Sequence, residues 1–121
     1  MCIRDRYLDY AIIEAEHAPR TLYQINAMTT ALRNKDITSI VRITSPNPEI
    51  AGATIDAGAD GILVPYCEDI EELKLSFGRT YFNPLKGEYL KRVLDKGKFP
   101  SKKSEEYLRE KSKSRLSLIH I

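Results

Sequence analysis

The sequence has few cysteines, little net charge and no long apolar run. No stretch approaches the roughly 18 consecutive apolar residues that a transmembrane helix needs. Two cysteines, Cys2 and Cys67, are too few for a disulfide framework, which favours a reducing, cytoplasmic compartment. The formal charge of +2 does not by itself indicate a nucleic-acid partner. The chain has 121 residues, of which 42% are hydrophobic and 30% are charged. This composition is typical of a globular domain.

The charge is unevenly distributed. Residues 1–85 contain 8 basic and 12 acidic side chains, whereas residues 86–115 contain 11 and 5. A lysine-rich segment can bind nucleic-acid phosphates. Here, however, Glu105, Glu106 and Glu110 are interleaved with the lysines and no aromatic ladder accompanies them. We therefore interpret this segment as a solvated helical surface and expect neither a nucleic-acid nor a membrane partner.

The two ends are unusual. Codons can be chosen for residues 1–6 and for residues 116–121 such that the first seventeen bases of each are reverse complements, and the pair resembles a transposase-based sequencing adapter read in frame. The alternative is a short basic leader with an amphipathic tail; the start lacks the apolar stretch of a signal peptide. We expect residues 1–6 and 116–121 to be adapter-derived and to make few core contacts. The natural segment would then run from about residue 7 to 115 and be truncated at both ends. His17 and Cys67 would be the histidine and the cysteine of this segment. We expect the Cys67 side chain to be buried and to act as a small hydrophobic group.

Short apolar runs alternate with helical patterns along residues 7–85. Expected strands at 11–13, 39–43 and 61–65 are apolar on both faces, as in a parallel sheet covered on both sides. The helix-spaced residues between and after them are Leu22, Ile25, Met28 and Leu32, then Ile50, Thr54 and Ile55, then Ile70, Leu73 and Phe77. Asn47-Pro48 and Asp69 are typical helix starts, and Gly58 can end the second helix. The sequence predicts an α/β protein with about three βα units.

A different pattern follows Pro84. Residues 86–115 predict two amphipathic helices of the same domain. The first has Tyr89, Leu90, Val93 and Leu94 on its apolar side; the second is capped by Ser104 and carries Tyr107 and Leu108.

Polar side chains follow the ends of the predicted strands, where parallel α/β folds place their sites. His17 comes after the first strand, Arg42 lies near the end of the second, and Pro65-Tyr66 ends the third. A charge within an apolar parallel strand must be paired or face a polar site. His17 could instead be an ordinary loop residue, and Asp56 a surface acid on a helix.

These residues resemble a known family in order and spacing. Glu14-Ala15-Glu16-His17-Ala18-Pro19, then Ile40-Val41-Arg42, then 55–65 (IDAGADGILVP) are similar to the HpcH/HpaI aldolase and citrate lyase family. The similarity is closest to its 4-hydroxy-2-oxo-acid, class II pyruvate aldolases. His17 and Arg42 are 25 residues apart, and Arg42 and Asp56 are 14 apart. The resemblance is firm over residues 7–87 and weaker beyond.

The resemblance implies a fold and a chemistry. The family fold is a (β/α)8 barrel of about 250 residues, of which this chain would supply roughly the second to fourth units. Such enzymes cleave a 4-hydroxy-2-oxo acid to pyruvate and an aldehyde with a divalent metal (Mg, Mn or Co), and a homo-oligomer is expected for the full-length protein. By position, His17 would be the catalytic acid–base, Asp56 the acid that orients it and raises its basicity, and Arg42 the group that binds the pyruvyl oxygen and balances the enolate charge.

The resemblance also implies limits. The family's metal-binding Glu and Asp lie on later strands, so no metal ligand is expected in this chain and the fragment should be inactive. The family often has Asp where this chain has Glu14. Two alternatives stay open: a citrate lyase β or malyl-CoA type of thioester lyase on the same barrel, and a barrel without catalysis that serves as a binding subunit.

Overall fold

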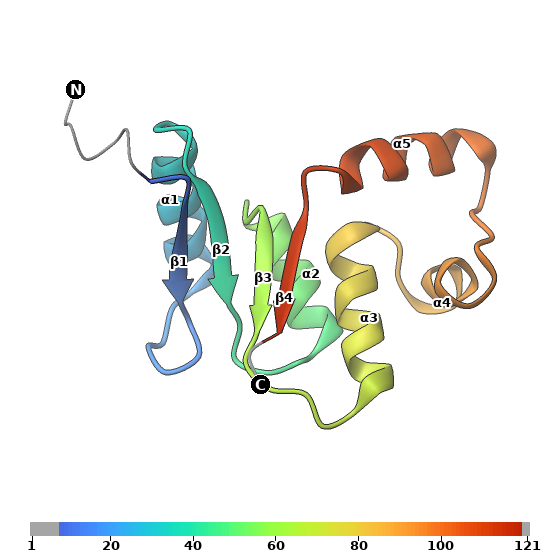
Figure 1. Ribbon diagram of the computed structural model, residues 1–121, viewed down its shortest axis with the longest axis horizontal. Helices are drawn as coiled ribbons and strands as arrows, with labels where there is room; N and C mark the ends of the chain where they lie inside the picture. The colour runs from blue at the N-terminus through green and yellow to red at the C-terminus, as the bar shows by residue number, and fades with distance from the viewer. Residues whose placement is uncertain (1–7, 120–121) are drawn as a thin grey trace.

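Four parallel strands form the centre of the structure, a computed structural model that describes residues 8–119 and the side chains of 8–117. The strands are β1 (Tyr10–Glu14), β2 (Thr38–Arg42), β3 (Gly61–Val64) and β4 (Leu116–Ile119), paired in that order (Figure 1). The helices are α1 (Leu22–Arg33), α2 (Pro48–Asp56), α3 (Ile70–Tyr81), α4 (Gly87–Lys96) and α5 (Lys102–Ser112). The predicted α/β fold with a parallel sheet is confirmed.

The two faces of the sheet differ in what covers them. Helices α1, α2 and α3 pack on one face, where they form a core with strand residues such as Ile13, Val41 and Ile62. On the other face Tyr10 and Ile12 stay 57% and 49% exposed. Successive strand residues point to opposite faces, so Glu14 and Arg42 project from the same face as Ile12. This face corresponds to the interior of a barrel.

Local signals explain where the helices begin. Thr21 and Gln24 form a reciprocal capping box at the start of α1, and Asn47 and Asp69 cap α2 and α3 as predicted. The predicted cap of α5 is wrong: Ser101 caps it, accepting the N–H of Ser104 at 3.1 Å. Ser101 prevails because its side chain lies one turn ahead and satisfies an N–H that the helix cannot.

The fourth strand was not expected. The backbone of residues 116–119 pairs with β3, so the expectation of few core contacts is wrong for this stretch. β3 would otherwise have an open edge, and an unpaired edge accepts any available strand. The adapter origin of these residues stays a prediction, while residues 1–6 and 120–121 lie outside the described residues.

The basic helices pack on the outer side of α3. Gly78 leaves room for Leu90 and Leu94 of α4, and Phe82 meets Phe99 edge to face at 5.7 Å between ring centroids. Figure 1 shows α4 and α5 beyond α3, on the side away from β1. Ile70, expected on the inner side of α3, is 71% exposed because it occupies the first position of the helix. No helix among residues 8–119 is long and apolar enough to cross a membrane.

Candidate active site

The carboxyl ends of the first three strands meet at one edge of the sheet. Glu14 at the end of β1 is in register with Arg42 at the end of β2, and Arg42 is in register with Leu63 of β3. Pro65 and Tyr66 follow β3 directly. The structure thus brings His17, Arg42 and the Pro65-Tyr66 end to the same edge, as the sequence predicts. Figure 1 shows the arrowheads of β1, β2 and β3 at this edge.

Arg42 is held by two carboxylates. Its side chain is 23% exposed; Nη1 lies 3.1 Å from Oε2 of Glu14 and Nη2 lies 2.5 Å from Oε2 of Glu16. Glu14 ends β1 and Glu16 lies in the loop that follows, and both carboxylates reach the guanidinium. The Nε–H has no hydrogen-bond partner among the described residues. The guanidinium is therefore fixed in place by its two outer nitrogens.

His17 lies in the loop between β1 and α1, and its side chain is 76% exposed. Its Nε2 is 3.4 Å from Oε1 of Glu16. Glu16, 14% exposed, thus lies between the imidazole and the guanidinium, with one oxygen toward each. The result is a chain of alternating groups, imidazole, carboxylate and guanidinium, at the carboxyl end of the sheet.

Glu14 makes two further contacts that shape this loop. Its Oε1 accepts the backbone N–H of Glu16 at 2.7 Å and of His17 at 3.2 Å. Burial by itself raises the pKa of Glu14, but these hydrogen bonds and the nearby Arg42 outweigh it and lower the pKa below its ordinary value. Sequence reasoning assigned no role to Glu14 or Glu16. The signal was available: two acids at alternate positions on the face that also presents Arg42.

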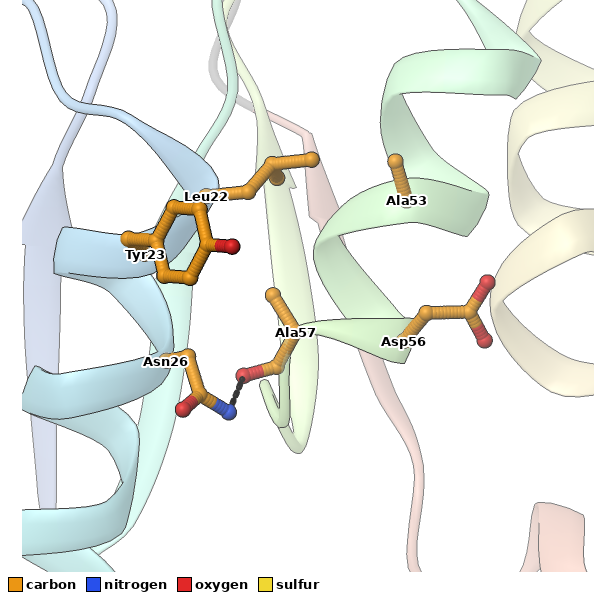
Figure 2. A pocket seen from close by; sticks show the side chains of 6 residues that line it. All are labelled: Leu22, Tyr23, Asn26, Ala53, Asp56 and Ala57. Carbon is orange, nitrogen blue, oxygen red and sulfur yellow. Dashed lines mark hydrogen bonds between the residues drawn. The ribbon is translucent and has the colours of Figure 1, made fainter.

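Asp56 is not part of this cluster, so its predicted pairing with His17 within the chain is wrong. It ends α2, which runs back toward the start of β3, on the face of the sheet opposite Arg42. Figure 2 shows its carboxylate pointing away from α1. Oδ1 accepts a hydrogen bond from Nδ2 of Asn83 at 2.6 Å, and Oδ1 of Asn83 accepts one from Nη1 of Arg79 at 2.8 Å. Adjacent motifs in sequence do not ensure contact, because a helix carries its last turn to the opposite end of the sheet.

A groove between α1 and α2 lies on the helical side of the sheet. Figure 2 shows Leu22 and Tyr23 beside Ala53 and Ala57, and Nδ2 of Asn26 donates to the carbonyl of Ala57 at 3.0 Å. The groove presents apolar side chains and no acid–base pair. It does not adjoin the cluster of Glu14, Glu16, His17 and Arg42.

The described residues do not fit a metal centre. They contain no group of three or more His, Cys, Asp or Glu side chains placed to hold a metal ion. Glu14 and Glu16 are the acids nearest to His17, and both are engaged by Arg42.

Comparison with known proteins finds aldolases that are similar to this chain in sequence. No protein-family profile matches the chain. It is 35% identical over 66 residues to the hydroxypyruvate/pyruvate aldolase of Roseovarius nubinhibens, a match that covers 54% of this chain and 26% of the relative. It is 28% identical over 76 residues to the 5-keto-4-deoxy-D-glucarate aldolase of Escherichia coli, covering 63% of this chain and 30% of the relative. The chain therefore spans less than a third of these curated relatives.

Solved structures show the same fold. An HpcH/HpaI aldolase from Desulfitobacterium hafniense superposes with a TM-score of 0.70 at 22% identity, over 97% of this chain and 45% of the other. The citrate synthase SbnG superposes with a TM-score of 0.71 at 21% identity, over 98% and 44%. The resemblance to the HpcH/HpaI aldolase and citrate lyase family is confirmed, and the described residues have the fold of one part of its barrel.

Proposed function

We propose that this chain is part of a cytoplasmic, metal-dependent aldolase that cleaves a 4-hydroxy-2-oxo acid to pyruvate and an aldehyde. One observation carries the proposal: Arg42 of β2 and His17 of the loop between β1 and α1 meet through Glu16 at the carboxyl end of the sheet. The two sequence relatives described above, both named as aldolases, support the reaction class.

Arg42 supplies positive charge at a fixed point. When the carbon–carbon bond breaks, negative charge develops on the oxygen of the pyruvyl enolate. A preorganised cation that faces this oxygen stabilises the transition state more than the substrate. Because Glu14 and Glu16 hold two of its nitrogens, the guanidinium needs no reorganisation during the reaction.

His17 is the group that moves the proton. Cleavage requires a base to take the proton of the 4-hydroxyl, and pyruvate formation requires a proton at the methyl carbon. Imidazole ordinarily titrates near neutral pH and can do both.

The divalent metal of this proposal would act as a Lewis acid on the 2-oxo acid. The described residues do not fit it, so its ligands are expected beyond this chain and no step above depends on them. The 121-residue chain by itself is accordingly expected to be inactive.

The test uses a complete barrel. The matched residues of this chain replace those of the Roseovarius relative, and aldol cleavage is measured together with deuterium entry into the methyl group of pyruvate. His17→Ala should lower both by about 10²–10⁴-fold. Glu68→Gln, an exposed acid in the loop after β3, is the matched control and should leave both unchanged. Normal cleavage and exchange in His17→Ala would refute the proposal.

A thioester lyase is the second candidate, because one solved neighbour is named a citrate synthase. That likeness is one of fold alone. Assaying the same barrel with malyl-CoA and with a 4-hydroxy-2-oxo acid separates the two, since only the thioester lyase would consume the CoA substrate.

A further inference from the structure

We propose that Glu14 is a positioning residue of this site, one whose two carboxylate oxygens set the His17 loop and the Arg42 guanidinium at the same time. The catalytic part of this inference rests on the proposed function. The arrangement of the three side chains is argued from contacts between described residues alone.

Each oxygen of Glu14 has a separate task. Oε1 accepts the N–H groups of Glu16 and His17, two consecutive amides of the loop. Such a side-chain turn fixes the backbone direction just where the imidazole leaves it. Oε2 accepts from Nη1 of Arg42 on the neighbouring strand at 3.1 Å. One side chain therefore links two functional groups that come from different βα units.

The backbone around Glu14 adds rigidity. Its carbonyl accepts from Nε of Arg20 at 2.8 Å, and the next N–H, of Ala15, donates to the carbonyl of Arg42 at 3.1 Å. The loop between β1 and α1 is thus tied at both its start and its end to the edge of the sheet. A displacement of the Glu14 carboxylate would move His17 and Arg42 together.

Charge strengthens the arrangement. The charged side chain that contacts the Glu14 carboxylate is Arg42 from β2; Arg20 of its own loop donates to the Glu14 carbonyl, and Glu16 and His17 donate their backbone N–H groups. Burial raises the pKa of Glu14, whereas the two amide donors and Arg42 favour the ionised carboxylate. The lowered pKa of Glu14 agrees with the donors prevailing. The carboxylate is therefore charged wherever the proposed reaction would run.

Nuclear magnetic resonance of the ¹⁵N-labelled chain tests the arrangement without any assay of activity. The amide signals of Glu16 and His17 should shift together with pH, with a midpoint below the ordinary glutamate pKa. Glu14→Gln should abolish this shared transition and displace the Arg42 Nε signal. Glu14→Asp, which keeps the charge and can still accept from the loop amides, should retain the transition.

The matched control is Glu110→Gln. Glu110 also has a lowered pKa, owing first to its hydrogen bond with Lys113, but it lies on α5 away from the site. This variant should leave the Glu16 and His17 transitions in place. If both transitions persist unchanged in Glu14→Gln, the proposed arrangement is wrong.

Turnover in the complete barrel tests the catalytic meaning. Glu14→Gln should lower kcat by up to about 100-fold, the scale expected when reacting groups shift by about 1 Å, with Glu14→Asp restoring part of it. Full turnover in Glu14→Gln would overturn the positioning role. If the amide transitions behave as expected but His17→Ala keeps full activity, the proposed function fails and the arrangement stands.

Discussion

Two arginines, Arg42 and Arg79, lie on otherwise apolar parts of the fold and are bound in different ways. Arg42 ends a strand, is partly exposed and contacts two carboxylates. Arg79 lies between α2 and α3, is 6% exposed, and donates from Nη1 to neutral oxygens: Oδ1 of Asn83 at 2.8 Å and the carbonyl of Leu85 at 3.1 Å. Its nearest acid, Glu49, is 3.9 Å away and 72% exposed.

The difference separates a chemical role from an architectural one. A buried charge is costly unless its hydrogen bonds are satisfied. Around Arg79 a glycine, Gly52, makes room and fixed neutral acceptors receive the donors, so the side chain serves as a rigid connector. Around Arg42 two acids and an exposed imidazole gather where a ligand can reach. Both arginines have an Nε–H without a hydrogen-bond partner among the described residues, so that feature alone does not identify a site.

The largest effect is expected when each arginine is replaced by methionine in the complete barrel, which tests whether the two arginines have different roles. Arg42→Met should lower kcat by about 10²–10³-fold, as for loss of an oxyanion partner. Arg79→Met should leave turnover per folded molecule within about threefold, because the residue contacts no group of the proposed site. Initial rates, normalised to the folded fraction from circular dichroism, make the measurement. A strong loss of turnover in well-folded Arg79→Met would show that the two arginines do not differ as stated.

The sequence predicted the position of Arg42 but not the structural role of Arg79. Strands, helix starts and the meeting of His17 with Arg42 followed from apolar periodicity, from Asn47 and Asp69 as caps, and from the parallel order of βα units. These are local signals, or direct consequences of topology. Arg79 carried no such signal, because only tertiary packing against Gly52 reveals that its charge is buried.

For Asp56 the sequence predicted a role in the site that the structure does not support. Its motif predicted a role beside His17, yet the carboxylate faces Asn83 at the end of α3. In a βα unit the helix returns to the opposite end of the sheet, so the last turn of α2 lies far from the strand ends, whereas the resemblance by residue spacing did not take this direction into account. Likewise β4 was missed because pairing with the open edge of β3 depends on that edge rather than on residues 116–119 themselves.

A smaller effect tests the close contact beneath Arg79. A methyl group at position 52 would collide with the guanidinium, so Gly52→Ala should destabilise the chain by about 1–3 kcal/mol, the usual cost of overpacking. Urea denaturation measures it. The double variant Gly52→Ala with Arg79→Met should lose less than the sum of the single losses, because the collision has been removed. Strict additivity would mean that the two residues do not interact.

A still smaller effect concerns the helix that follows the His17 loop. Thr21 accepts the N–H of Gln24 at 3.1 Å, and Oε1 of Gln24 accepts the N–H of Thr21 at 2.9 Å. Thr21→Ala should therefore cost about 1 kcal/mol, which thermal unfolding can detect. Thr30→Ala, an exposed threonine within α1, is the control and should change stability by less than about 0.5 kcal/mol. Equal losses in the two variants would contradict the capping role.

The smallest effect concerns an exposed ion pair, in contrast to the buried Arg79 and the partly exposed Arg42. Lys74 of α3 and Asp95 of α4 are 39% and 56% exposed, with Nζ 2.5 Å from Oδ1. Their hydrogen bond raises the pKa of Lys74 above its ordinary value and lowers that of Asp95. The stabilisation by Asp95 is therefore complete above its ordinary pKa of 3.8 and is lost as pH falls through the lower, folded value. The stabilisation by Lys74 is complete below 10.5 and is lost as pH rises through the higher, folded value.

The effect of salt on stability distinguishes this exposed ion pair from the buried Arg79 contact. Because exposed charges are screened, added salt should reduce the difference in stability between the chain and Asp95→Asn at neutral pH. The same salt should leave the loss caused by Gly52→Ala unchanged, since the Arg79 contact is closed to solvent. Urea denaturation in low and high salt gives both values. A salt-insensitive Asp95→Asn difference would mean that the surface pair is shielded from solvent ions, and that exposure is not what separates it from Arg79.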